Sequence, residues 1–197
     1  MHIYILYAHP APRSFSREVL ERFTRGLGDA GHSFEVADLY AQGFLSEMDA
    51  PQYDREVGLD PDRPVPDDVR LEQERIARAD ALAFIYPVWW SDCPAKLKGW
   101  FDRVWTYGYA YFYDTDNARQ TRISIRKALV LCPAGHTVEH LEEIGIAESM
   151  RRIMLHDRLL GIGVKEARME ILGGMLPKVE TYRAANLERA YRLGLEF

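Results

Sequence analysis

The sequence YPVWWSDCPAKLKGWFDRVWTYGYAYFY occupies residues 86–113 and decides how the rest of the chain is interpreted. It contains all four tryptophans and nearly half of the aromatic residues of the protein. An apolar run, ALAFIY, leads into a proline-containing turn, and a helix-like segment begins near Pro94. The order is therefore strand, loop and helix. In open α/β sheets ligands bind at loops of this kind, although a core corner or a subunit interface would also gather aromatic residues.

Apolar residues in the helix-like segment recur at the spacing of one helical face. The pattern i, i+3, i+4, i+7, i+8 is filled by Leu97, Trp100, Phe101, Val104 and Trp105. This spacing predicts an amphipathic helix over residues 94–105, and Pro94 suits its first turn. Gly99 costs roughly 1 kcal/mol relative to alanine inside a helix. We therefore expect another segment to pack closely against it.

Strand-like and helix-like segments alternate along the rest of the chain. Strands are expected at residues 3–8, 33–39, 81–86, 128–132 and 167–172. Helices are expected after the first loop and at residues 67–79, 94–105, 139–160 and 178–195. This alternation predicts an α/β fold, a doubly wound five-stranded parallel sheet with helices on both faces. The pattern is compatible with the strand order 2-1-3-4-5, which the sequence alone leaves open.

Residues 40–66 interrupt this alternation. They are rich in Pro and Asp, include DPDRPVPDD, and show little periodicity. We expect a long surface excursion. Connections of this length usually have a function or are mobile. The plainer interpretation is a simple solvated loop.

Length, charge and cysteine content restrict the class of protein. A chain of 197 residues can bury a full core, so we expect one domain over residues 1–197. The net charge of −5 argues against a nucleic-acid surface. Cys93 and Cys132 are far apart and form no CxxC motif, so reduced, buried thiols are expected and no metal site. With no targeting segment at the start, the expected location is the cytoplasm.

A polar stretch, HPAPRSFS, follows the first strand at residues 9–16. Its prolines exclude a helix, and Ser14 or Ser16 could cap the helix that follows. A helix N-terminus favours a phosphate, and His9, Arg13 and the two serines supply further donors. The alternative is a plain helix cap with a buried His9 and a solvated Arg13. The stretch lacks GxGxxG, which counts against a tightly held nicotinamide.

Two further loops should lie at the same edge of the sheet. The second follows the third strand and contains Pro87, Val88, Trp89 and Trp90. The third follows the fourth strand and contains Pro133, Ala134, Gly135 and His136. Three loops at one edge can hold a phosphate at one end and a flat ring at the other. A flavin needs this arrangement, because backbone N–H groups bind its ring edge while apolar side chains exclude water.

The motifs AHPxPxSFS and P-x-x-W-x-x-x-P-A-x-L-K-x-W-F-D-R-V are diagnostic. With them the chain strongly resembles the NAD(P)H:quinone oxidoreductase family of flavodoxin-fold flavoproteins. That family includes modulator-of-drug-activity proteins and ancillary subunits of potassium-efflux systems. The resemblance covers most of the chain, and its specific motifs lie within residues 4–20 and 84–113. It implies a flavodoxin-like sheet in the order 2-1-3-4-5.

The resemblance also implies roles for individual residues. The positions that hold the flavin phosphate and ribityl chain in the family are occupied by His9, Ser14, Phe15 and Ser16. Arg13 stands where the family often has a hydroxyl residue. The positions that border the isoalloxazine ring are occupied by Pro87, Val88, Trp89 and Trp90, with Pro133, Ala134 and Gly135 in the third ring-binding loop.

The resemblance implies an assembly as well. The helix at residues 94–105 resembles the one that helps to form the homodimer interface of the family. Three tyrosines follow this helix, and we expect them to close an acceptor pocket across that interface: Tyr107, Tyr109 and Tyr111.

The third loop departs from the family. The best-known members have a TTGG-like loop there, followed by a Tyr and a His proposed to relay protons to the quinone. Here the loop reads CPAG, His140 occupies the expected Tyr position, and Ile146 lies near the expected His. His140 or His136 could deliver a proton, because imidazole titrates near neutral pH. A surface or structural role is the alternative for each.

The expected function is that of a flavin-dependent NAD(P)H oxidoreductase. It would bind FAD, with FMN as the alternative, and pass hydride from NAD(P)H to a quinone or similar flat acceptor by a two-electron ping-pong scheme. A second hypothesis is a flavoprotein regulatory subunit of a membrane transporter. A third is a one-electron carrier such as flavodoxin, although HPAPRSFS differs from the T/S-rich phosphate loop of such carriers.

Overall fold

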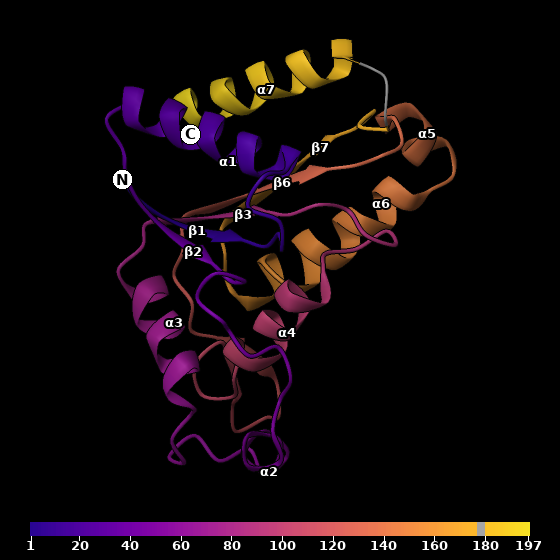
Figure 1. Ribbon diagram of the computed structural model, residues 1–197. Coiled ribbons are helices and arrows are strands. Elements are labelled where there is room, and N and C mark those ends of the chain that lie inside the picture. Colours follow the sequence, from indigo (N-terminus) through magenta and orange to yellow (C-terminus); the bar gives the residue numbers. More distant parts are fainter. Residues whose placement is uncertain (177–179) are drawn as a thin grey trace.

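The computed structural model describes residues 1–176 and 180–197. Its main sheet has five strands in the order β2-β1-β3-β6-β7 (Figure 1). These strands are β1 (His2–Tyr7), β2 (Ser33–Asp38), β3 (Ala81–Ile85), β6 (Lys127–Pro133) and β7 (Glu166–Leu172). All neighbouring strands are parallel. Numbered within this sheet alone, the order is 2-1-3-4-5, so the expected flavodoxin-like topology is confirmed.

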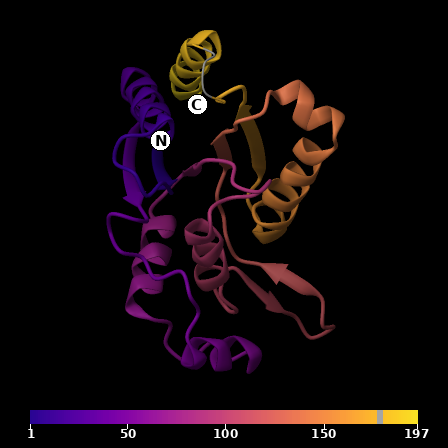
Figure 2. The same ribbon diagram turned by 45° about the vertical axis from the view of Figure 1, so that its right-hand side comes forward.

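Helices cover both faces of the sheet (Figure 2). One face carries α1 (Phe15–Asp29) and α7 (Glu180–Leu195), and the opposite face carries α3 (Asp67–Ala77) and α4 (Ala95–Val104). Alternate residues of β1 divide between the two cores: Ile3 and Ile5 pack toward α1, whereas Tyr4 and Leu6 pack toward α4. Because both faces of β1 are covered, both sets of alternating side chains are apolar, which explains its continuous apolar run.

Helix α1 begins and ends as its sequence predicts. The Ser14 hydroxyl accepts a hydrogen bond from the backbone N–H of Arg17 at 3.2 Å, so Ser14 is the capping residue. Gly31 follows the helix with a φ of +78°, a left-handed conformation that glycine adopts without strain. Helix α1 packs very closely on α7, because Gly26 faces the backbone of Gly194.

The aromatic stripe of α4 lies in the core of this chain. Trp100 is fully buried, Phe101 is nearly so, and both contact Phe84 of β3. Gly99 has the expected close neighbour: a Cβ atom there would lie 2.1 Å from the backbone oxygen of Ser46. Trp105 ends the helix half-buried, and its indole N–H donates to the backbone oxygen of Arg158 at 3.1 Å. The core of this single chain therefore accounts for the aromatic stripe of α4.

The plainer interpretation of residues 40–66 as a simple solvated loop is wrong in part. They contain α2 (Ala50–Val57), which Asp49 caps. Polar side chains anchor this helix, since the buried Gln52 donates to the backbone oxygen of Arg103 at 2.8 Å. The buried Arg55 donates to the backbone oxygen of Arg63 at 2.7 Å. A short helix held by polar groups has no apolar stripe, so periodicity does not reveal it.

The expected continuous helix over residues 139–160 is also wrong. The chain forms α5 (Val138–Glu143), α6 (Ile146–Arg151), a π-helical turn η1 (Arg152–Asp157) and a 3₁₀ turn η2 (Leu160–Ile162). Gly145, with a φ of +73°, separates α5 from α6. Buried residues on both sides of this break face the same core. Their spacing therefore resembles one long helix in the sequence.

A two-stranded antiparallel hairpin between α4 and β6 was not predicted. It pairs β4 (Tyr111–Tyr113) with β5 (Arg119–Thr121) and extends from the body of the molecule (Figure 2). Strands of three residues are too short for a periodic signal. Asp114 closes the turn by accepting hydrogen bonds from the backbone N–H groups of Asp116 and Ala118.

Helix α7 ends at Leu195, as expected. Its expected first residues, 178 and 179, lie outside the described residues. Within residues 1–176 and 180–197, no helix combines the length and the apolar character that a membrane span requires.

Candidate functional site

The three loops predicted to meet at one edge of the sheet do meet there. Backbone hydrogen bonds between neighbouring strands continue past the strand ends into the loops. The N–H of Ala8 donates to Ile85 at 3.0 Å, and the N–H of Val88 donates to Pro133 at 2.8 Å. The strands thus present the three loops side by side at their carboxyl ends, where open α/β sheets bind ligands.

The first loop leads directly into the N-terminus of α1. The Ser14 hydroxyl lies 3.3 Å from that of Tyr7 and caps the helix. The N–H groups of Phe15 and Ser16 belong to the first turn, where a helix supplies them with no internal acceptor. This end of the site therefore offers the hydrogen-bond donors and the positive end of a helix dipole that an anion needs.

An open groove of about 550 Å³ runs from this loop to the end of β2. It is lined by Tyr7, His9, Pro10, Ala11, Pro12, Arg17, Glu21, Asp38, Tyr40 and Ala41. The His9 ring borders the groove and lies 6.1 Å from the Trp89 ring of the second loop. A polar groove at a helix N-terminus, next to an aromatic wall, fits a group that joins phosphate to a flat ring system.

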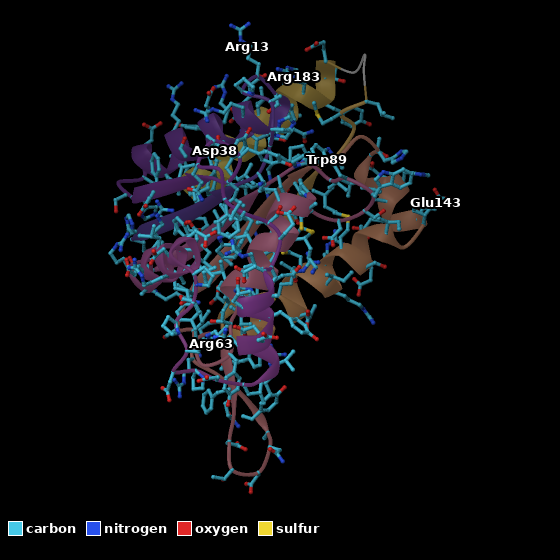
Figure 3. The ribbon with its side chains drawn as sticks, turned by 60° about the horizontal axis from the view of Figure 1, so that its bottom comes forward. Arg13, Asp38, Arg63, Trp89, Glu143 and Arg183 are labelled. Atoms are coloured by element: carbon cyan, nitrogen blue, oxygen red, sulfur yellow. The ribbon has the colours of Figure 1, made fainter. Side chains whose placement is uncertain are left out.

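The other predicted residues of the first loop differ in position. His9 is half-buried, and its Nδ1 accepts a hydrogen bond from the N–H of Ala11 at 3.0 Å. Arg13 is exposed and extends into solvent, away from Trp89 (Figure 3). Phe15 packs on the core beneath the guanidinium of Arg183, 5.2 Å away. Ser16 is buried within α1. The structure thus brings His9 to the groove, places Ser14 behind the lining residue Tyr7, and leaves Arg13 apart from it.

The second loop is a tight turn with an unusual backbone. Trp89 and Asp92 exchange backbone hydrogen bonds of 3.0 and 3.2 Å, and between them Trp90 and Ser91 have φ values of 49° and 65°. This φ pattern is that of a type I′ turn, which prefers Asn-Gly. A left-handed residue other than glycine costs about 1–3 kcal/mol. The turn leaves the Trp90 side chain fully exposed, and Pro87 before it is buried.

An ion pair that the sequence analysis missed supports this turn. Both carboxylate oxygens of Asp92 accept hydrogen bonds from the guanidinium of Arg158, each at 2.9 Å. Burial raises the pKa of Asp92, but Arg158 and the backbone N–H of Cys93 outweigh it, so the pKa lies below its ordinary value. The two residues are far apart in sequence, and no motif connects them.

The third loop is held by the segment after β7. The backbone oxygens of Ala134 and His136 accept hydrogen bonds from Met175 and Gly174 at 3.0 and 2.8 Å. Pro133 and Ala134 are buried, whereas Gly135 is exposed. The rings of His136 and His140 lie 4.9 Å apart, and both residues are exposed. Either imidazole can therefore exchange protons with solvent.

The three tyrosines lie away from these loops within one chain. Helix α4 starts beside the second loop and carries the chain about 15 Å before Tyr107. The Tyr109 hydroxyl donates to the backbone oxygen of Gln73 in α3, and Tyr107 donates its N–H to Glu56 of α2. Arg63, which shares a hollow with Tyr109, lies well below Trp89 in Figure 3. Tyr111 begins the protruding hairpin.

The groove residues outside the first loop were not predicted from the sequence: Tyr7, Arg17, Glu21, Asp38, Tyr40 and Ala41. The Asp38 carboxylate accepts hydrogen bonds from the N–H groups of Tyr40 and Ala41, which shapes the end of β2. Because β2 lies next to β1, residues that follow it must border the first loop. The strand order therefore accounts for Asp38, Tyr40 and Ala41, whereas Arg17 and Glu21 lie on α1.

Both cysteines lie near the site and are buried. Burial raises the pKa of the Cys93 thiol to about 12 and also raises that of Cys132. At pH 8 only about one Cys93 in ten thousand is then a thiolate, the reactive form. We expect native protein to resist iodoacetamide at pH 8, whereas both thiols react in denaturant. Rapid labelling of folded protein, followed by mass spectrometry, would contradict this.

No group of three or more His, Cys, Asp or Glu residues lies close enough to hold a metal ion in the part of the chain that the structure describes.

Comparisons with known proteins identify the family. The sequence profile described as "Flavodoxin-like fold" matches residues 1–193. A solved structure of an NAD(P)H:quinone oxidoreductase from Methanothermobacter marburgensis is 65% identical, with a TM-score of 0.96 over 99% of this chain and 98% of that one.

Curated relatives are more distant. An uncharacterized NAD(P)H oxidoreductase from Haemophilus influenzae is 27% identical over 195 residues, which cover 96% of this chain and 92% of the relative. A ribosyldihydronicotinamide dehydrogenase-like protein from Penicillium crustosum is 28% identical over 173 residues, 78% of this chain. The matched region spans only 65% of that fungal relative. With the flavodoxin-like sheet and the converging loops, these matches show that the chain belongs to the NAD(P)H:quinone oxidoreductase family, within the flavodoxin-like fold.

Proposed function

We propose that this chain, a flavin-dependent NAD(P)H oxidoreductase by family, reduces quinones or similar flat acceptors by two-electron ping-pong hydride transfer. The observation that carries the proposal is the convergence of three loops on one sheet edge. An anion-binding helix N-terminus lies at one end of that edge, and two tryptophans lie at the other. A bound flavin would supply the redox chemistry, accepting hydride from the nicotinamide and passing it to the acceptor.

The chain's residues would bind and orient the flavin. Ser14 and the first-turn N–H groups of α1 would hold the phosphate, with His9 beside them. The turn at Trp89 and Trp90 would border the ring and exclude water from one side. Low water content strengthens the hydrogen bonds that orient a bound ring. Arg13 would contact only the outer end of the ligand, because it is not part of the groove lining and extends into solvent away from Trp89 (Figure 3).

The third loop would border the ring through its backbone. Ala134 and Pro133 are buried and firmly held, so this side of the site is rigid. His140 or His136 would deliver the proton that the reduced acceptor needs, because both side chains are exposed beside the third loop and imidazole is a common general acid in enzymes. The matched variants His140→Gln and His136→Gln identify which one acts.

We propose a homodimer that completes the acceptor pocket. Tyr107, Tyr109 and Tyr111 lie beyond the far end of α4 in their own chain, so they can reach an acceptor only in a partner's site. Their aromatic surface suits a flat quinone. The fully exposed Trp90 side chain supports the same conclusion, because large exposed indoles are typical of interfaces.

FAD is the proposed flavin, with FMN as the alternative. The groove continues past the helix N-terminus to Asp38 and Tyr40 at the end of β2, which leaves room beyond the phosphate for an adenosine. A single domain over residues 1–197 and a cytoplasmic location stay predictions from the sequence.

The test begins with the purified chain. We expect it to gain a yellow flavin spectrum when FAD is added, and mass spectrometry of the released ligand distinguishes FAD from FMN. Loaded protein should then oxidise NADH or NADPH only when a quinone is present, with parallel lines in a double-reciprocal plot. Trp90→Ala should weaken flavin binding, whereas His156→Ala, an exposed change on η1, should not.

Two results would overturn the proposal. One is a chain that binds neither FAD nor FMN. The other is a bound flavin that NAD(P)H reduces by single electrons through a stable semiquinone, as in a one-electron carrier.

A further inference from the structure

The turn that presents Trp90 is not stabilised by its own sequence. Trp90 and Ser91 both adopt left-handed φ values, 49° and 65°, at positions where a type I′ turn prefers Asn and Gly. The Trp90 side chain is fully exposed and so gains no stabilisation from the described chain. Something outside the turn must hold this backbone in place.

Arg158 is the group that holds it. Its two terminal nitrogens donate to the two oxygens of Asp92, the last residue of the turn, at 2.9 Å each. A bidentate pair fixes orientation as well as distance. The Asp92 carboxylate also accepts a hydrogen bond from the N–H of Cys93 at 2.7 Å, which closes the turn on the side of α4.

Arg158 is itself rigid. Its side chain is 9% exposed and lies over the Phe101 ring of α4, with the guanidinium carbon 5.3 Å from the ring centre. Its backbone oxygen accepts the indole N–H of Trp105, and its N–H donates to Ile153 five residues earlier. This π-helical hydrogen bond places one extra residue in the helical turn η1 that precedes Arg158. The extra residue rotates Arg158 toward Asp92. Such π-helical insertions often occur at functional sites.

We infer that Arg158 is a positioning residue for the flavin site: through Asp92 it holds the left-handed turn that presents Trp90 to the isoalloxazine ring. This inference rests on the proposed function, because it assumes that the turn borders a flavin. Arg158 does not touch the flavin. It sets the geometry of the residues that do, and a rigid second layer of this kind determines how well a site fits its ligand.

The test uses Arg158→Lys, which keeps the charge but loses the bidentate geometry. We expect flavin to bind about tenfold more weakly, a factor that corresponds to the strain of one left-handed residue. The visible circular dichroism of the bound flavin should also change, because the ring environment has moved. Arg152→Lys is the matched control. It changes an exposed arginine on η1 that pairs with Glu148, and its flavin affinity should equal that of the wild type.

A second substitution separates positioning from simple destabilisation. Ser91→Gly suits the left-handed turn without external support. In the Arg158→Lys background we expect it to restore flavin affinity and the visible dichroism, even where the melting temperature stays lowered. Amide exchange of Trp89 and Asp92 provides a readout that needs no flavin. It should be faster in Arg158→Lys and slow again in the double variant.

The outcomes distinguish the two hypotheses. If the wild type binds no flavin, the proposed function fails. If the wild type binds flavin but Arg158→Lys binds it equally well, the inference fails and the proposed function stands. The inference also fails if Ser91→Gly does not restore affinity, or if amide exchange changes while flavin binding does not.

Discussion

Replacing Glu72 with alanine is expected to lower the free energy of unfolding by about 3–5 kcal/mol, the range for breaking a buried charged network. Glu72 is 1% exposed and joins three elements of the fold. It accepts hydrogen bonds from the hydroxyl of Tyr4 in β1, from the indole N–H of Trp100 at 2.7 Å, and from Arg75 at 2.6 Å. Removing the carboxylate leaves the Tyr4 hydroxyl and the Trp100 indole N–H buried and unpaired, each at a cost of about 1–3 kcal/mol, whereas Arg75 keeps its ion pair with Glu35.

Urea denaturation measures this loss, and Glu74→Ala is its matched control. Glu74 lies two residues away on the same helix and pairs with Arg70 at the surface. Exposed pairs of this kind contribute only about 0–1 kcal/mol. Burial and the neighbouring carboxylate both raise the pKa of Tyr4, so its hydroxyl remains a donor across the accessible pH range. Equal losses from the two alanine variants would show that the network is not a major source of stability.

Gly99→Ala is expected to destabilise the protein by about 1–3 kcal/mol, the usual cost of overpacking, or somewhat more. The new Cβ would lie 2.1 Å from the backbone oxygen of Ser46 and 2.6 Å from its Cα. Because the obstacle is backbone, α4 and the segment of residues 40–66 must separate. Limited proteolysis should therefore cut that segment faster in the variant, and urea denaturation should record the loss of stability.

Gly28→Ala is the matched control for this prediction. A Cβ at Gly28 meets nothing within 4 Å, and Gly28 is an exposed residue of α1. Alanine there should stabilise the helix by about 0.5–1 kcal/mol. The same chemical change is thus expected to act with opposite signs at two helical positions. A destabilisation at Gly28 as large as that at Gly99 would mean that close packing is not the cause.

The sequence predicts the strands and helices whose buried residues recur at regular spacing. Strands β1, β3 and β6 are continuous apolar runs because helices cover both of their faces, and the positions of all five strands are confirmed within one or two residues. Helix α2 and the hairpin were missed because polar contacts and a turn hold them. The break at Gly145 was missed because one glycine scarcely interrupts a pattern of buried residues.

The residues of the candidate site also fall into two groups, those with a local signal in the sequence and those without one. The loops at His9, Trp89 and Ala134 could be predicted, since each directly follows a buried strand and the motifs within them are local. Asp38 follows from the strand order that the resemblance implies, because β2 lies next to β1, although the motifs of the single loops do not include it. Arg158 could not be predicted, because its relation to the second loop depends on a π-helical turn that has no distinct signal in the sequence.

The contact between α1 and α7 sets the order in which this protein can finish folding. Helix α1 is synthesised before the second strand of the sheet, yet the helix that packs on Gly26 is α7, which follows all five strands and ends at Leu195. Throughout translation the apolar side of α1 lacks its permanent neighbour, while the opposite face of the sheet can already acquire α3 and α4. The side of the core that holds α1 can therefore close only after α7 has been synthesised.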